Sequence, residues 1–135
     1  MPAQIFLVED HPVMRQSLAD VLAREPDLDV CGAAESAEDA LDTLTTTDCD
    51  VLVTDVGLPG MDGVALTERA GAERPDLPVL VISVDDGPPV VARARAPGAR
   101  GFLPKRRLAR TLPDPLGAVL RGEARFDAAD DAPAH

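Results

Sequence analysis

Five side chains that could do chemistry close apolar runs at separate places in the chain. Asp55 ends the run that begins at residue 51, and glycines and a proline after it force a loop. Ser83 and Lys105 end two further runs, and the acidic pair Glu9-Asp10 follows the run of residues 5–8. Carboxylates bind hard cations and can act as nucleophiles, and an ammonium group can neutralise an oxyanion. Taken alone, Asp55 could equally be an ordinary strand-end aspartate that caps the next loop.

Lys105 is the single lysine of the chain, which also has 12 arginines. Arginine and lysine are not interchangeable at a binding site, because the guanidinium is a planar fork and the ammonium a compact point charge. The composition therefore indicates that a compact cation is needed at this position. Chance placement among the 13 basic positions is the alternative.

The apolar runs alternate with segments of helical pattern, which predicts how these side chains come together. Short runs rich in β-branched residues predict buried strands, and apolar residues recurring every three to four positions predict helices. Ser36 and Asp62 suit the N-caps of two helices, and prolines limit others. We expect strands at residues 4–8, 28–33, 51–55, 77–83 and 100–105, and helices at residues 12–24, 36–44, 63–73, 85–95 and 115–121.

Five strands alternating with five helices predict an α/β fold, a doubly wound five-stranded parallel sheet. Right-handed crossovers bring the carboxyl ends of all strands to one edge of such a sheet. That edge collects Glu9, Asp10, Asp55, Ser83 and Lys105. Three acids, a hydroxyl group and the single lysine at one edge predict a combined cation and phosphate site.

Composition and charge limit the class of protein. The formal net charge of −11 and the pI near 4.4 repel phosphate backbones, so a DNA-binding role would need another domain. No apolar run approaches the roughly 18 residues of a membrane span, and the first run ends in acids, unlike a signal peptide. We therefore expect a cytoplasmic protein with no membrane association. Cys31 and Cys49 lack metal-ligand spacing, which favours reduced structural thiols.

The composition changes where the last predicted helix ends, near Arg121 and Gly122. Residues 123–135 are rich in alanine and aspartate and show no periodicity. We expect residues 1–122 to form the domain and residues 123–135 to be an acidic, alanine-rich tail or linker remnant.

The chain resembles a response-regulator receiver domain over residues 3–122. The resemblance rests on the pair Glu9-Asp10, on Asp55-x-x-Leu58-Pro59-x-x-Asp62-Gly63, on Ser83 followed by Asp85 and Asp86, and on Gly98-Ala99-x-Gly101-Phe102-Leu103-x-Lys105. Within the family, Val8-Glu9-Asp10-His11-Pro12-Val13-Met14-Arg15 and the pair Lys105-Arg106 are most similar to NarL/FixJ-type regulators. In those, a C-terminal helix-turn-helix domain binds DNA. The implied fold is flavodoxin-like, with strand order 2-1-3-4-5.

The resemblance implies a phosphoacceptor function in a two-component signalling system. Asp55 would take a phosphoryl group from a phosphohistidine of a partner histidine kinase, forming an aspartyl phosphate. Mg²⁺ would be bound directly by Asp10, Asp55 and the backbone carbonyl of Gly57. Glu9 would act mainly through a metal-bound water, and Lys105 would neutralise the phosphoryl oxygens.

The resemblance also implies a switch. Ser83 would donate a hydrogen bond to the phosphoryl group, and a shift of the loop after the fourth strand would open room for Phe102 to turn inward. The surface of the fourth helix, fifth strand and fifth helix would change, with a homodimer and a separate DNA-binding domain as the expected partners. The chain would promote only its own phosphorylation and dephosphorylation, so we do not expect an enzyme. Phe102 could equally be a plain core residue.

Other interpretations of the same residues stay open. Val84 stands where the family usually has a small residue, and prolines flank the fourth and last helices, so the main alternative is an atypical receiver. Such a receiver would be a phosphorylation-independent interaction or ligand-sensing module. A phosphatase-like enzyme is disfavoured because Gly57 stands where a second acid is usual, and a flavin carrier because the chain has no Trp or Tyr. His11 could be a metal ligand, although a helix-opening residue at a solvated edge is the better interpretation.

Overall fold

The computed structural model describes residues 2–85, 87–95, 98–107 and 112–126 of the chain. Its strands are β1 (Ala3–Val8), β2 (Leu28–Ala34), β3 (Val51–Asp55), β4 (Val79–Ser83), β5 (Gly101–Pro104) and β6 (Arg125–Phe126). Its helices are α1 (Pro12–Ala23), α2 (Ala37–Leu44), α3 (Gly63–Glu73), α4 (Pro88–Arg95) and α6 (Pro113–Leu120). A 3₁₀ turn, η1 (Lys105–Arg107), directly follows β5.

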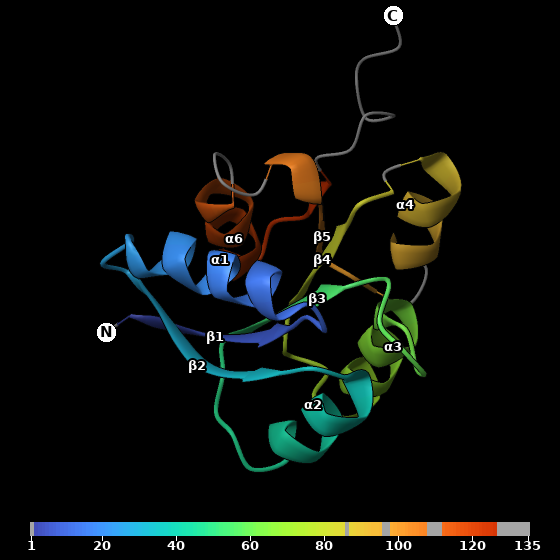
Figure 1. Cartoon of the computed structure of the whole chain (residues 1–135), viewed down its shortest axis with the longest axis horizontal. Helices are drawn as coiled ribbons and strands as arrows, with labels where there is room; N and C mark the ends of the chain where they lie inside the picture. Colours follow the sequence, from blue (N-terminus) through green and yellow to red (C-terminus); the bar gives the residue numbers. More distant parts are fainter. Residues whose placement is uncertain (1, 86, 96–97, 108–111, 127–135) are drawn as a thin grey trace, which may run out of the picture.

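The strands form one parallel sheet with helices on both faces (Figure 1). Helices α1 and α6 lie on one face, and α2, α3 and α4 lie on the other. The strand order is β2-β1-β3-β4-β5-β6, which confirms the predicted doubly wound, flavodoxin-like order for the first five strands. Because every pair is parallel, the carboxyl ends of the strands meet at one edge.

The two central strands, β3 and β4, are buried along their whole length. Alternate side chains point to opposite faces of a strand. Leu52 and Val81 pack with α2, α3 and α4, whereas Val53 and Ile82 pack with α1 and α6. Each such burial stabilises the fold by roughly 1.5–3 kcal/mol. Burial on both faces explains why these runs are apolar throughout instead of alternating with polar residues.

The helix ends follow from local hydrogen bonding. Ser36 and Asp62 each accept a backbone N–H from the first turn of α2 and α3, at 3.1 Å and 2.9 Å, so both predicted caps are confirmed. Two predicted beginnings are wrong, because α4 begins at Pro88 instead of residue 85 and α6 at Pro113 instead of residue 115. The first turn of a helix leaves its N–H groups unbonded, so proline is tolerated there.

The predicted five strands are one too few, because Arg125 and Phe126 form β6 beside β5. We expected residues 123–135 to be a tail. A two-residue strand has no periodicity of its own, so only the preceding turn and the edge of β5 determine it. The division of the chain at residue 122 stays a prediction, and Asp86 and residues 127–135 lie outside the described residues.

The two cysteines are free thiols within the fold, with Cys31 half-buried and Cys49 buried. Burial raises the pKa of both thiols and so favours the protonated, unreactive form. This agrees with the prediction of structural thiols. In the ranges that the structure describes, no helix has the length and apolar character needed to cross a bilayer.

Candidate functional site

The carboxyl ends of four strands bring the predicted site residues to one edge of the sheet. Glu9 follows β1 and Asp55 ends β3. Ser83 ends β4, and Lys105 follows β5. The Nζ atom of Lys105 lies 2.8 Å from Oε1 of Glu9 and 2.9 Å from Oδ2 of Asp55. One ammonium group therefore bridges two carboxylates from different strands.

Burial strengthens the electrostatic interactions at this edge. Glu9 is fully buried, Asp55 is 4% exposed, and the side chain of Lys105 is 11% exposed. Burial raises the pKa of Glu9, and the contact with Lys105 only partly offsets that rise. Burial by itself would lower the pKa of Lys105, but the contacts with Glu9 and Asp55 outweigh burial and raise it. The ammonium group therefore stays charged at neutral pH.

Glu9 is also held by neighbours in its own segment. Its Oε2 accepts the backbone N–H of His11 at 3.2 Å, and its carbonyl accepts a hydrogen bond from Nη1 of Arg15 at 2.8 Å. Its Oε1 is buried and has no aligned hydrogen-bond donor in the described part of the chain, although the Lys105 ammonium lies at ion-pair distance. An oxygen with spare acceptor capacity suits a water molecule or a cation.

Asp10 adds a second, partly buried carboxylate beside Glu9. One candidate ligand atom from each of Glu9, Asp10 and His11 lies within 4.8 Å of the others. His11 is exposed and directly precedes α1, as predicted for a helix-opening residue, and makes no side-chain cap bond. Of the two acids, Glu9 is linked to Asp55 through Lys105.

The loop after β3 is built closely around Asp55. Its Oδ1 accepts the backbone N–H of Gly57 at 3.2 Å. Gly63, the first residue of α3, lies directly against the backbone of Asp55 and donates its N–H to the carbonyl of Val56 at 2.9 Å. Gly57 itself is exposed, with nothing within 4 Å of the place where a Cβ would stand. The predicted backbone ligand therefore lies on an accessible part of the loop.

Ser83 and its neighbour differ sharply in exposure. Ser83 is buried, and its Oγ accepts the backbone N–H of Asp85 at 3.1 Å, which fixes the hydroxyl group at the strand end. Val84 is 81% exposed, so its branched side chain stands on the solvent side of this edge.

Phe102 is fully buried in the core between the sheet and α4. The ring packs in the same cluster as Val81, Val91 and Ala94. It therefore already points inward in this structure, where we expected an inward turn only after the loop shifts. A plain core role accounts for this position, and the switch role of Phe102 stays a prediction.

Two contacts that support the loop after Asp55 were not predicted. Oε2 of Glu38, on α2, accepts the backbone N–H of Met61 at 3.2 Å. Nη2 of Arg93, on α4, lies 2.7 Å from Oδ2 of Asp62. The partners are 23 and 31 residues apart in the sequence, so no local pattern could indicate either contact.

A comparison of the sequence with known families assigns the chain to one of them. The chain matches the family described as response regulator receiver domain over residues 5–114, which include the acidic residues, Ser83 and Lys105. The chain belongs to the response-regulator receiver family. Receiver domains of this family are signalling modules and not classical enzymes. The resemblance that the sequence indicated is confirmed.

Two curated relatives of this receiver domain are named as a transcriptional regulatory protein and as a response regulator. It is 31% identical over 121 residues to the transcriptional regulatory protein DegU of Brevibacillus brevis, covering 90% of this chain and 51% of DegU. It is 30% identical over 104 residues to the nitrate/nitrite response regulator protein NarL of Escherichia coli K12, covering 77% of this chain and 48% of NarL. The chain thus spans about half the length of these relatives.

Solved structures give the same assignment for the receiver domain. A two-component response regulator of the LuxR family from Aurantimonas sp. SI85-9A1 superimposes with a TM-score of 0.91 at 28% identity. The match covers 98% of this chain and 94% of that chain. The match to NarL itself confirms the similarity to NarL-type regulators that the sequence indicated.

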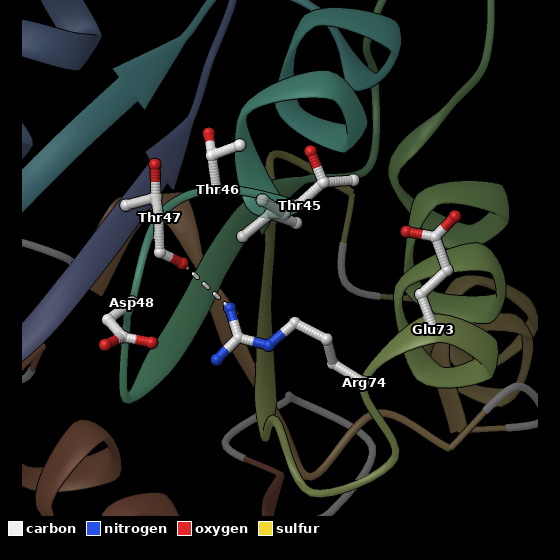
Figure 2. Close-up of a pocket in the computed structure, with 7 residues that line it drawn as sticks. Thr45, Thr46, Thr47, Asp48, Glu73 and Arg74 are labelled. Carbon is white, nitrogen blue, oxygen red and sulfur yellow. Dashed lines mark hydrogen bonds between the residues drawn. The ribbon is translucent and has the colours of Figure 1, made fainter.

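A hollow at the opposite edge of this receiver domain lies before the amino ends of β3 and β4 (Figure 2). It has a volume of about 440 Å³ and is lined by Leu44, Thr45, Thr46, Thr47, Asp48, Glu73 and Arg74. Nη1 of Arg74 donates to the carbonyl of Thr47 at 3.0 Å, and Nη2 donates to the carbonyl of Cys49 at 3.3 Å. Because the Arg74 guanidinium binds the receiver's own backbone, we interpret this hollow as a structural contact between the end of α3 and the loop before β3.

Arg74→Met should lower the free energy of unfolding by about 2 kcal/mol, because charge-assisted hydrogen bonds to two backbone carbonyls are lost. Urea unfolding measures the change. Arg69→Met is the matched control, since Arg69 is an exposed residue of α3, the helix that Arg74 caps, and should change stability by less than about 0.5 kcal/mol. Equal effects of the two substitutions would show that the hydrogen bonds of Arg74 do not stabilise the fold.

Proposed function

We propose that Asp55 accepts a phosphoryl group from a phosphohistidine of a partner histidine kinase. The observation that supports this most directly is the ammonium of Lys105, which lies 2.9 Å from Oδ2 of Asp55. A fixed cation beside the carboxylate offsets the repulsion that an anionic phosphoryl donor would otherwise meet. Membership of the receiver family supports the same reaction.

Mg²⁺ fits the donor atoms of this edge. The acids Glu9, Asp10 and Asp55 and the carbonyl of Gly57 offer only hard oxygen ligands, which Mg²⁺ prefers. The grouping of one candidate ligand atom from each of Glu9, Asp10 and His11 within 4.8 Å supports a place for a cation or one of its waters beside these acids. We assign Asp10, Asp55 and the Gly57 carbonyl to the ion, and Glu9 to a metal-bound water. When bound, the ion supplies positive charge that screens the phosphoryl oxygens.

The transfer itself uses side chains of this chain. A carboxylate oxygen of Asp55 attacks the phosphorus atom, the bond from phosphorus to the kinase imidazole nitrogen breaks, and the imidazole leaves with the bonding electron pair. Lys105 binds phosphoryl oxygens as a point charge. Ser83 donates its O–H to a further phosphoryl oxygen, because its Oγ is already fixed at the end of β4. In the proposed switch, the loop after β4 and Phe102 respond to this new bond.

The output of the proposed switch lies beyond this chain. DegU is named as a transcriptional regulatory protein and NarL as a response regulator, and both are about twice as long as this sequence. We propose that the receiver acts in the cytoplasm, forms a homodimer and controls transcription through a DNA-binding domain outside this chain. The net charge of −11 supports placing the DNA contacts elsewhere.

Intact-protein mass spectrometry after incubation with acetyl phosphate tests the proposal. We expect a gain of one phosphoryl group in the presence of Mg²⁺, little gain with a chelator, and no gain in Asp55→Asn. The substitution keeps the size of the side chain but removes the nucleophilic carboxylate.

The absence of an adduct under every condition would contradict the phosphoacceptor function. It would favour the atypical receiver, which acts without phosphorylation. Val84 would then be the first residue to replace by alanine, because its exposed side chain stands beside Ser83. An adduct of equal size in Asp55→Asn would instead show that a residue other than Asp55 is phosphorylated.

A further inference from the structure

The chain turns sharply after α6 and returns to the sheet. The N–H of Glu123 donates to the carbonyl of Ala118 at 2.9 Å, and the N–H of Gly122 donates to the carbonyl of Val119 at 3.0 Å. These two bonds form a Schellman motif, and Gly122 has the positive φ of 88° that the motif requires. Local backbone geometry therefore directs residues 123–126 along a defined path.

That path ends on the outer edge of β5. Arg125 pairs with Gly101 and Phe126 with Phe102, and the N–H of Arg125 donates to the carbonyl of Arg100 at 2.9 Å. The approach is so close that a Cβ on Gly101 would lie 2.9 Å from the carbonyl oxygen of Arg125. The glycine at this position therefore makes room for the returning backbone.

The same segment also contacts α4. The guanidinium carbon of Arg95 lies 3.9 Å from the centre of the Phe126 ring, a cation–π contact. Two residues earlier in this helix, Arg93 binds Asp62 in the loop after Asp55. Helix α4 thus contacts the C-terminal segment with one arginine and the loop beside the acidic site with another.

We propose that residues 122–126 are a built-in ligand for the edge of β5 and for α4, and that α4 couples their docking to the loop after Asp55. Phe126 is the anchor, Gly122 sets the direction of approach, and the pair Arg93–Asp62 transmits the coupling. The segment covers part of the edge formed by α4 and β5. Its release would expose that edge.

Hydrogen exchange at the backbone N–H of Arg125, measured by NMR on the full chain, tests the docking. Phe126→Ala should speed this exchange about tenfold, because the cation–π contact and part of the apolar burial are lost. Exchange in α1 should not change, which separates local release from global unfolding. Val13→Ala is the control, because Val13 is 80% exposed on α1 and remote from β6 in the sequence. An unprotected Arg125 N–H, or equal protection in Phe126→Ala, would overturn the docking.

Asp62→Asn tests the coupling. Asparagine retains the N-cap of α3 but loses the charge that binds Arg93. We expect about threefold faster exchange at Arg125, the size expected for losing a partly exposed ion pair. Arg93→Gln should have the same effect, since it removes the other partner. If both substitutions leave the exchange at Arg125 unchanged, the coupling through α4 is wrong.

The consequence for phosphorylation rests on the proposed function. If acetyl phosphate with Mg²⁺ adds a phosphoryl group to Asp55, it should speed exchange at Arg125 in the wild type but not in Asp55→Asn. Because docking and phosphorylation would then oppose each other, Phe126→Ala should shift the equilibrium of phosphoryl transfer toward the phosphorylated protein. An adduct without any change at Arg125 overturns the coupled release. Failure to form an adduct contradicts the proposed function instead, and the comparison of variants without phosphate still decides whether the segment docks.

Discussion

Replacing Lys105 with methionine should lower the rate of Asp55 phosphorylation by acetyl phosphate about 100-fold. The Nζ atom of Lys105 contacts both Glu9 and Asp55, within 2.9 Å of each. Methionine retains an unbranched stem but removes the charge, so an incoming phosphoryl group would meet two carboxylates without this counter-charge. Intact mass as a function of time, at fixed acetyl phosphate and Mg²⁺, measures the rate.

The same substitution should make stability depend on pH. Burial already raises the pKa of Glu9, and removal of the ammonium raises it further. When the pKa of a carboxyl group is higher in the folded than in the unfolded state, the folded protein loses stability as the pH rises from the unfolded pKa to the folded pKa. Below the unfolded pKa it is protonated in both states and has no effect. We therefore expect Lys105→Met to lower the free energy of unfolding by about 3 kcal/mol at pH 8 and by much less at pH 4.

Lys105→Arg is the matched control for both effects. It retains the positive charge, so most of the stability at pH 8 should remain. Phosphorylation should still slow down, because a planar guanidinium does not reproduce a compact ammonium between two carboxylates. If Lys105→Met is phosphorylated at the wild-type rate, Lys105 does not neutralise the phosphoryl group.

The site could be predicted because it depends on strand ends. Parallel strands with right-handed crossovers place their carboxyl ends at one edge, so reading Glu9, Asp55, Ser83 and Lys105 as strand-end residues was enough to bring them together. Lys105 also had a signal in composition, as the single lysine. The contact distances and the burial of Glu9 came only from the structure.

Other features of the structure could not be predicted, because no local sequence pattern indicates them. Strand β6 is too short to show periodicity, and its pairing depends on a turn at Gly122 and on an edge that only the folded sheet provides. The pair Arg93–Asp62 joins residues from different helices and loops, so their separation in sequence hides it. Phe102 shows a further limit, since an apolar residue in a strand is compatible with both a core and a switch position.

Gly63→Ala should lower the free energy of unfolding by about 3 kcal/mol. A Cβ on Gly63 would lie 2.8 Å from the carbonyl carbon of Asp55 and 3.0 Å from Cα of Val56. Backbone atoms at the end of a central strand cannot move aside as a flexible side chain can, so α3 or the end of β3 must shift. Urea unfolding measures the loss. The rate of Asp55 phosphorylation should also fall, because the carboxylate is displaced from Lys105.

Gly71→Ala distinguishes this steric effect from the general preference of helices for alanine. Gly71 lies in the same helix, and nothing stands within 4 Å of the place its Cβ would take. Alanine there should raise the free energy of unfolding by about 0.5–1 kcal/mol, since glycine is the poorer helix former. The two substitutions add the same methyl group to one helix, yet we expect changes of opposite sign in the free energy of unfolding. If Gly63→Ala proves neutral or stabilising, α3 does not rest on the backbone of Asp55, and the loop is not the rigid support that the site requires.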